Sequence, residues 1–205
     1  MRFGWKLPIA LLVLSACLLI TGGKGLVVGL LPAVDLDDPS VDWGSLKANQ
    51  HVKVENICTD GYFYYYTEDN VEKARRYAII DIVNYEGEDY LAYYMGFNAQ
   101  KEDFSKLDSS AEATNEWLCG DSNIPDYTYV GRDGYLRKMK KDEIDALREW
   151  ISELGWPDED VEDALVPYII MENQSQLTNV LMFAGGLLLL VGGVALVILN
   201  VKNRD

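Results

Sequence analysis

A single histidine, three cysteines and a large excess of carboxylates are the residues of this chain that could carry chemistry. His51 has no second histidine and no Cys-x-x-Cys pair with which to share a zinc ion. The chain also lacks a Gly-x-Ser-x-Gly elbow and a Gly-rich phosphate loop. Because His51 precedes Val52 and Val54, we interpret it as a strand residue. The sequence therefore predicts no catalytic, cofactor-binding or metal-binding residue.

The carboxylates are numerous enough to raise two other hypotheses, a calcium site and a glycosidase pair. The densest acidic cluster comprises Asp158, Glu159, Asp160, Glu162 and Asp163. It lacks the spacing, the central glycine and the distal glutamate of an EF-hand loop. Carboxylates at these positions are typical of the first turn of a helix, where they favour the helix dipole. With so many acids, pairs arise by coincidence, so a membrane-anchored hydrolase that uses carboxylates is kept only as an alternative function.

Two cysteines of the central segment, Cys58 and Cys119, could form a disulfide in an oxidising compartment. Such a bond would close a loop of about 60 residues and stabilise the fold by roughly 4 kcal/mol in the chain-entropy model. The alternative is a pair of reduced thiols.

Aromatic residues concentrate in two predicted strands, and six of them are a candidate face for stacking on peptides or sugars: Tyr62, Tyr64, Tyr66, Tyr90, Tyr93 and Tyr94. The alternative is that alternate tyrosines fill the core while the others form cross-strand pairs.

The charge of the chain is concentrated in its middle. Between Asp35 and Leu177 lie 32 of the 33 acidic residues, against 13 of the 18 basic ones. A segment this acidic repels a phosphate backbone, which argues against nucleic acid as a partner.

The middle segment lies between two apolar runs. Val180–Leu199 is uncharged throughout, and twenty helical residues span about 30 Å, the thickness of a bilayer core. We therefore expect a transmembrane helix over 180–199 within a C-terminal segment, residues 173–205. The N-terminal segment, residues 1–34, is expected to form a second span over about 7–31, with Lys24 snorkelling to the far interface. A cleaved signal peptide, or a lipoprotein signal at Cys17, remains an alternative.

Basic residues next to the spans set the expected orientation. Arg2 and Lys6 flank the first span, and Lys202 and Arg204 flank the second. The positive-inside rule then places both termini in the cytoplasm and the central domain outside the cell membrane.

Small residues recur every seven positions along both predicted spans, so that each set lies on one helical stripe. Such stripes let helix backbones approach closely in lipid. They are candidates for packing between the two spans, on a membrane-protein partner or in a homo-oligomer, and they comprise Ser15, Gly22, Gly29, Gly185, Gly186, Gly192 and Gly193.

Between the spans we expect a tether over residues 35–48 and an α+β domain over residues 49–172. Four antiparallel strands are predicted up to Phe97, with turns at Asp60-Gly61 and at 86–89 and a charged connector over 68–76. The later segments, in chain order, are a helix capped by Ser109 and Glu112, a hairpin turning at 131–134, an amphipathic helix over 142–154, and a helix from Pro157 that Pro167 interrupts.

This order of elements is that of a small OB-like barrel with C-terminal helices, and a generic α+β sheet is the alternative. In its layout, and over the run from Leu46 to Gly155, the chain resembles uncharacterised bacterial membrane proteins that place an OB-like domain between two spans. The resemblance contains no sharp motif and implies no activity. We expect a non-enzymatic envelope protein whose acidic domain is an interaction or sensing module, with an accessory subunit of a transport or assembly complex as another alternative.

Overall fold

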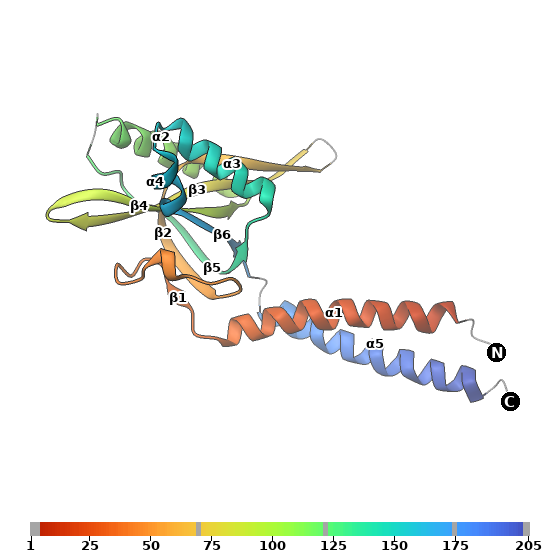
Figure 1. Ribbon diagram of the computed structural model, residues 1–205. Helices are drawn as coiled ribbons and strands as arrows, with labels where there is room; N and C mark the ends of the chain where they lie inside the picture. Colours follow the sequence, from red (N-terminus) through yellow and green to blue (C-terminus); the bar gives the residue numbers. More distant parts are fainter. Residues whose placement is uncertain (1–4, 69–70, 121–122, 174–175, 203–205) are drawn as a thin grey trace. The chain divides into compact units, whose positions relative to one another are not determined.

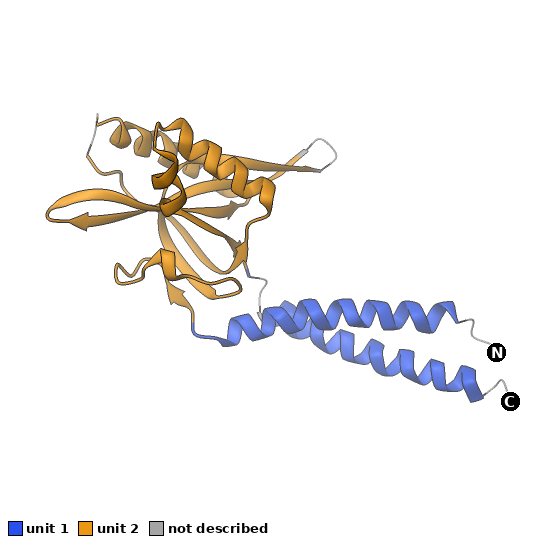
Figure 2. Ribbon diagram, in the orientation of Figure 1, with its two compact units in different colours: residues 1–32, 173–205 blue, residues 33–172 orange. Residues whose placement is uncertain are grey.

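The computed structural model describes residues 5–68, 71–120, 123–173 and 176–202, and the chain divides into two compact units (Figures 1 and 2). Residues 1–32 and 173–205 form the first unit, and residues 33–172 form the second.

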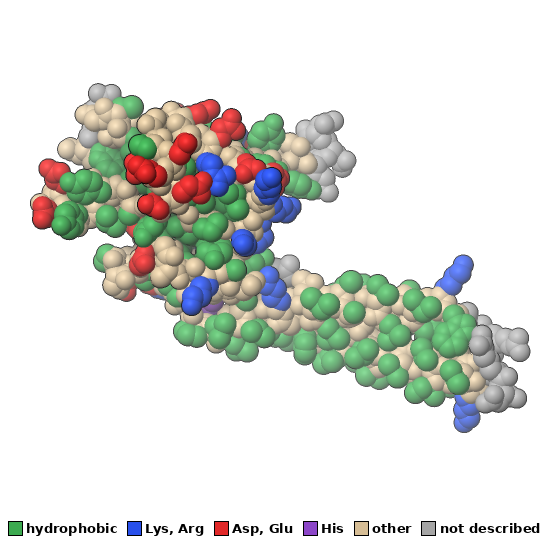
Figure 3. Space-filling view, in the orientation of Figure 1, with side chains coloured by type: hydrophobic (Ala, Val, Ile, Leu, Met, Phe, Trp, Pro, Cys, Tyr) green, Lys and Arg blue, Asp and Glu red, His purple; other side chains and the backbone are tan. Residues whose placement is uncertain are grey.

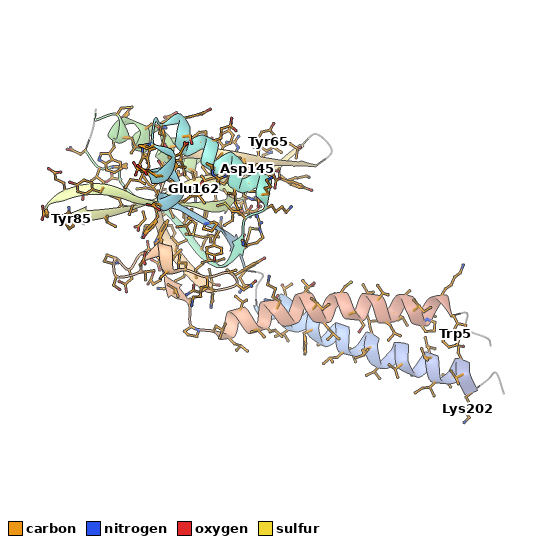
Figure 4. The ribbon with its side chains drawn as sticks, viewed as in Figure 1. Trp5, Tyr65, Tyr85, Asp145, Glu162 and Lys202 are labelled. Atoms are coloured by element: carbon orange, nitrogen blue, oxygen red, sulfur yellow. The ribbon has the colours of Figure 1, made fainter. Side chains whose placement is uncertain are left out.

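The first unit is a pair of helices, α1 (Lys6–Leu30) and α5 (Gln176–Lys202), that pack along each other (Figure 1). By length and composition, both helices are long and apolar enough to cross a membrane. Hydrophobic side chains cover the visible face of both (Figure 3). Trp5 and Lys202 lie at the same end of the pair (Figure 4), so the two helices run antiparallel.

The second unit is α+β, with a six-stranded mixed sheet in the order β1-β2-β3-β4-β6-β5. The strands are β1 (Val34–Asp35), β2 (His51–Glu68), β3 (Val71–Tyr85), β4 (Glu88–Ala99), β5 (Thr128–Lys138) and β6 (Leu165–Glu172). β2 also pairs with β5, so the pairings run from β2 through β3, β4, β6 and β5 back to β2. β4 and β6 are parallel, as are β1 and β2, and every other pair is antiparallel.

The ring of pairings encloses one hydrophobic core, to which each of its five strands contributes buried side chains. They include Val54 from β2, Ile79 from β3, Phe97 from β4, Leu136 from β5 and Ile170 from β6. The helix α2 (Phe104–Leu118) adds Leu107 to this core.

A second core lies on the other face of the strands, because neighbouring strand residues point to opposite sides. Ile80 and Tyr94 of β3 and β4 pack there against Leu147 of α3 (Lys141–Glu153) and Val161 of α4 (Asp158–Ala164). The two helices thus cover the outer face of these strands.

The segment 35–48, predicted to be a tether, is part of the domain. Leu36, Trp43 and Leu46 are buried in the first core, and the 3-10 helix η1 (Trp43–Ser45) lies within the segment. The prediction is wrong because these three apolar side chains gain more from burial than a free linker could.

The predicted turn at Asp60-Gly61 is a bulge within one long strand. Thr59 pairs with Ile79 and Gly61 with Ala78, which leaves Asp60 without a partner on β3. Gly61 has φ +130°, a conformation open to glycine. The charged connector is also mostly strand, since β3 begins at Val71, while residues 69–70 lie outside the described residues.

The predicted hairpin at 131–134 is a bulge as well. Gly131, at φ +54°, sits where the pairing with β2 changes register. Gly134 lies in the strand against β6, and a Cβ there would meet the Met171 carbonyl oxygen at 2.4 Å. β6 itself is absent from the prediction. The helix α4 already ends at Ala164, and Pro167, predicted to interrupt it, is the third residue of β6.

The helix predicted to start at Ser109 begins earlier, at Phe104, directly after the 3-10 helix η2 (Lys101–Asp103). The capping box is formed by Gln100 and Asp103 instead. Ser109 lies inside the helix, where its hydroxyl donates to the Ser105 carbonyl oxygen at 3.1 Å.

Candidate functional site

A pocket of about 430 Å³ lies between the segment that follows β1 and the strands β2 and β3. Its volume falls within the range of small-molecule sites, roughly 300 to 1,000 Å³. The residues that line it are Leu36, Asp37, Asp38, Pro39 and Trp43 from that segment, Asn56 and Ile57 from β2, Ile80, Asp81 and Ile82 from β3, and Tyr127 from the approach to β5.

Backbone hydrogen bonds pin one wall of the pocket to β2. The Leu36 N–H donates to the Lys53 carbonyl oxygen at 2.9 Å, continuing the short parallel pairing of β1. The Asp37 carboxylate then accepts from the backbone N–H groups of Glu55, at 2.6 Å, and Asn56, at 2.9 Å. Since its oxygens are engaged with the backbone, Asp37 holds the wall in place.

Asp81 is the half-buried carboxyl of the pocket. It lies on β3 where the pairing with β4 changes register, and it makes no hydrogen bond or ion pair with any described residue. Burial, together with the nearby Asp42, raises the pKa of Asp81 to about 6. Asp81 is thus a carboxyl poised to change charge near neutral pH and to accept a partner.

Aromatic side chains complete the surroundings of Asp81. Tyr127 is half exposed at the pocket, and burial raises the pKa of its hydroxyl to about 12. The Tyr93 hydroxyl is hydrogen-bonded to Asp42, which raises the pKa of Tyr93. Gly44 permits this approach, because a Cβ there would stand 2.8 Å from the Tyr93 hydroxyl oxygen.

The pocket therefore combines an unpartnered carboxyl, phenol and indole rings and aliphatic walls. None of its lining residues in the described part of the chain is Lys, Arg or His. Such a lining can bind a cation or a polar neutral group, and its carboxyl can donate or accept a proton near pH 6.

Of the two alternatives for Cys58 and Cys119, a disulfide or reduced thiols, the structure has the second, with both thiols free. Cys58 is fully buried in the second core, where burial raises its pKa to about 12. Cys119 is exposed at the end of α2. The two sulfurs belong to different environments, one among apolar side chains and one in solvent. Cys17 is a free, exposed cysteine on α1.

The three tyrosines of β2 do not share one face, because the register shift after Tyr62 disturbs the alternation. Tyr62 stacks edge-on against Tyr77 beneath Arg75. Tyr64 instead donates from its hydroxyl to Asp142 at 2.9 Å, next to α3. Tyr66 is 51% exposed.

The three tyrosines of β4 also separate. Tyr94 is completely buried and packs against Trp156. Tyr93 turns toward Asp42, and Tyr90 is exposed with its hydroxyl 2.7 Å from Glu88. The hypothesis of a single aromatic face is therefore wrong, and Tyr94 fits the alternative of a core residue.

The small residues predicted to pack helices divide into two groups in the first unit. At Gly22, Gly186 and Gly193 an added Cβ would collide with the facing helix, at 2.7 to 3.0 Å. Ser15 is also buried, and Gly29 is half-buried. By contrast, nothing lies within 4 Å of a Cβ built on Gly185 or Gly192, so these two glycines do not face α1.

His51 is a buried strand residue, with Nε2 3.0 Å from the Asp133 carboxylate. Among the described residues, no group of three His, Cys, Asp or Glu side chains is arranged to hold a metal ion.

Sequence reasoning missed the pocket, because its residues come from four separate segments and no spacing links them. One signal was available: Asp81 is the lone charged residue in the apolar run Tyr77–Val83. Because charged side chains are rarely buried, a lone charge within an apolar strand indicates a candidate functional residue.

The chain matches, over residues 4–202, the family described as Domain of unknown function (DUF8577), and it belongs to that family. No curated protein and no solved structure matches it.

Proposed function

We propose that this protein is a two-span protein of the cell envelope whose central unit is a non-enzymatic binding or sensing module outside the membrane. The apolar length of α1 and α5 supports the two spans. The shared end of Trp5 and Lys202 supports termini on one side (Figure 4). Lys6 and Lys202 supply positive charge at that end, which favours the cytoplasm.

We also propose that the central unit is an OB-like barrel. The ring order β2-β3-β4-β6-β5 supports it, with a helix between the third and fourth strands and a parallel pairing of the third with the fifth. An OB-fold is a five-stranded Greek-key barrel, and proteins of that class bind oligonucleotides or oligosaccharides on the face of their second and third strands.

The observation that carries the functional proposal is the cover over that face. The second and third ring strands are β3 and β4, and their outer side chains Ile80 and Tyr94 are buried beneath α3 and α4. The usual OB surface is thus occupied by the chain itself. The Asp81 pocket, beside β2 and β3, is a concave site among the described residues, and we assign ligand binding to it.

The orientation can be tested with the native cysteines. In a Cys17→Ala chain, a membrane-impermeant maleimide added to intact cells should label Cys119, which is exposed. Cys58 should stay unlabelled, because burial raises its thiol pKa to about 12. Lys202→Cys in a chain that also carries Cys119→Ser should react only after permeabilisation. The opposite result would place the domain in the cytoplasm and contradict the proposal: in intact cells, Lys202→Cys is labelled in its chain and Cys119 stays unlabelled in the Cys17→Ala chain.

Binding itself can be tested with a ligand set of mixed charge. The full chain in nanodiscs should show ligand-dependent thermal stabilisation by at least one anionic, neutral or cationic small molecule or peptide. Asp81→Asn should remove or alter this shift, whereas Glu112→Gln on the exposed face of α2 should not. If no compound shifts the wild-type midpoint, the small-ligand function fails.

A carboxylate hydrolase is the second candidate, and the pKa of Asp81, raised to about 6 beside Asp42, favours it. In that case Asp81→Asn would still bind a ligand but would no longer convert it. Mass spectrometry of the ligands recovered after incubation distinguishes conversion from simple binding.

A further inference from the structure

The charged side chains that line the pocket are of one sign. Asp37, Asp38 and Asp81 line it, Asp42 is close enough to raise the pKa of Asp81, and none of the described lining residues is basic. An anionic ligand would meet repulsion from every ionised lining group, with no guanidinium or ammonium among the described lining residues to offset it. The lining therefore selects against carboxylate and phosphate ligands.

The carboxyl of Asp81 differs from the other acids because it has no partner. Asp37 is engaged with two backbone N–H groups, and Asp38 accepts from Ser40 at 2.8 Å. Asp42 accepts from Gly44 N–H at 2.9 Å. Asp81 alone among these four acids has neither hydrogen bond nor ion pair to a described residue, although it is half buried. A ligand that donates to Asp81 would relieve the cost of its burial.

The other walls of the pocket suit an organic cation better than a bare metal ion. Tyr127, which is half exposed, offers an aromatic ring, and the partly buried Ile82 offers aliphatic surface. Trp43, Ile57 and Ile80 also line the pocket, but each is buried. Aromatic rings attract ammonium groups through cation–π interactions, and alkyl chains bury well against aliphatic walls.

We propose that the Asp81 pocket binds an organic ammonium group, which ion-pairs with the Asp81 carboxylate while its alkyl part lies against Tyr127 and Ile82. This inference rests on the proposed binding function and names its ligand class. The ammonium can belong to a free polyamine or to a lysine side chain of a peptide.

Isothermal titration calorimetry on the full chain in nanodiscs at pH 7.5 tests the proposal with three probes. Spermidine represents the free amine. The peptide acetyl-Gly-Lys-Gly-amide represents a lysine side chain, and acetyl-Gly-norleucine-Gly-amide is its uncharged counterpart. We expect saturable binding of one equivalent of spermidine or of the lysine peptide, and at least tenfold weaker binding of the norleucine peptide. Preference for spermidine identifies a free amine, and preference for the peptide identifies a side chain.

Two variants and a salt control locate the binding. Asp81→Asn should weaken it about tenfold, the size expected for loss of a charge-assisted hydrogen bond. Glu112→Gln removes one charge elsewhere and should leave the affinity unchanged. Raising NaCl from 0.1 to 0.5 M should cost much less than Asp81→Asn, because diffuse attraction to an acidic surface is screened more strongly than a contact.

Tyr127 supplies a second, independent variant pair. Tyr127→Phe keeps the ring and should retain affinity, whereas Tyr127→Leu should lose about threefold. Binding that persists equally in Asp81→Asn and Tyr127→Leu, equal binding of the two peptides, or no saturable binding of any cation overturns the proposal. Should anionic or neutral compounds stabilise the chain through Asp81, the ammonium inference fails while the binding function stands.

Discussion

Asp60 is a buried carboxyl whose charge works against the fold. It is 1% exposed. One of its oxygens accepts from the Trp150 indole N–H at 2.9 Å and from the Tyr94 hydroxyl at 3.4 Å, and the other has no hydrogen-bond partner in the described structure. Burial raises the pKa of Asp60 above its usual 3.8. Because the folded chain then holds the proton more tightly than the unfolded one, this group's contribution to stability falls as pH rises from 3.8 to the folded pKa.

Asp60→Asn should therefore stabilise the central unit at pH 7 by about 1 kcal/mol, since the amide keeps an acceptor for Trp150 and carries no charge. The gain should shrink as pH falls to 3, below the usual Asp pKa of 3.8, because the wild-type carboxyl is then mostly protonated in both the folded and the unfolded chain. Urea denaturation of both chains at the two pH values, followed by tryptophan fluorescence, measures the difference. A variant less stable than wild type at pH 7 would show that the ionised carboxylate is favoured at this site.

Glu143 is the opposite case, a buried carboxylate that the fold needs. It is 3% exposed. It accepts from both terminal nitrogens of Arg137, at 2.9 and 2.6 Å, and from the Lys140 backbone N–H at 2.8 Å. The Arg76 Nε lies 3.6 Å away. Two poorly solvated guanidinium groups thus share one carboxylate.

Glu143→Gln should destabilise the central unit by about 3 kcal/mol, because it leaves both guanidinium groups without a compensating charge. Glu162→Gln is the matched control. Glu162 pairs with Arg148 at the surface of α3 and α4 (Figure 4), where loss of the pair should cost less than 1 kcal/mol. Equal midpoints of urea denaturation for the two variants would contradict this account.

Some elements could be predicted from the sequence. In these elements the apolar residues recur with the spacing of a helix or a strand, and the same residues are buried in the structure. The pattern of Ile144, Leu147 and Ile151 indicates the helix α3, and the structure places it over Lys141–Glu153 with Leu147 and Ile151 buried. β3 and β4 likewise follow from their apolar and aromatic runs. In each case the local pattern and the tertiary contacts favour the same state.

The elements that were predicted wrongly are those in which a glycine or proline is required by contacts with a distant segment and not by a turn. Gly61 and Gly134 read as turn residues, yet each lies in a strand. A Cβ on Gly61 would stand 2.8 Å from the Trp150 ring, and one on Gly134 would strike β6. Pro167 reads as a helix breaker, but its carbonyl accepts from the Met139 N–H at 3.0 Å within the sheet. Close approach of distant segments leaves the same sequence signal as a turn.

The helix pair offers a prediction with a control built into the chain. Gly186→Leu with Gly193→Leu places side chains where Leu19 and Leu12 already stand, 2.9 and 3.0 Å from an added Cβ. These substitutions should separate α1 from α5, because in lipid the helices depend on close packing. A membrane two-hybrid assay on the two helices should lose at least half its signal.

Gly185→Leu with Gly192→Leu is the matched control, since nothing lies within 4 Å of either added Cβ. It adds the same side chains to the same helix one residue away and should leave the α1–α5 signal unchanged. If both pairs of substitutions reduced the α1–α5 signal equally, the loss would come from a change in α5 itself and not from its contact with α1.

At the scale of the whole molecule, stretches of different composition fold into different units. The apolar runs became α1 and α5, and the acidic segment became a single α+β unit over residues 33–172. Composition could not reveal the pocket, because Trp43, Asp81 and Tyr127 meet only once the segment after β1 folds over β2 and β3. The pocket is a product of topology, whereas the division into units follows from the different solvent preferences of apolar and charged residues.

The same acidity predicts how the whole molecule responds to salt. The net charge is −15, and Figure 3 shows carboxylates gathered on the visible face of the central unit. Their mutual repulsion opposes the compact state, and salt screens it over about 10 Å at 0.1 M. Exposed ion pairs such as Lys53 with Asp35 are weakened as well, but each contributes little.

Raising NaCl from 0.05 to 0.5 M should therefore stabilise the central unit by about 1 kcal/mol, raising its Tm by about 4 °C. Differential scanning calorimetry in nanodiscs measures the shift, and sucrose at equal osmolality separates screening from exclusion of solute at the surface. A midpoint that falls with salt would mean that the ion pairs outweigh the repulsion.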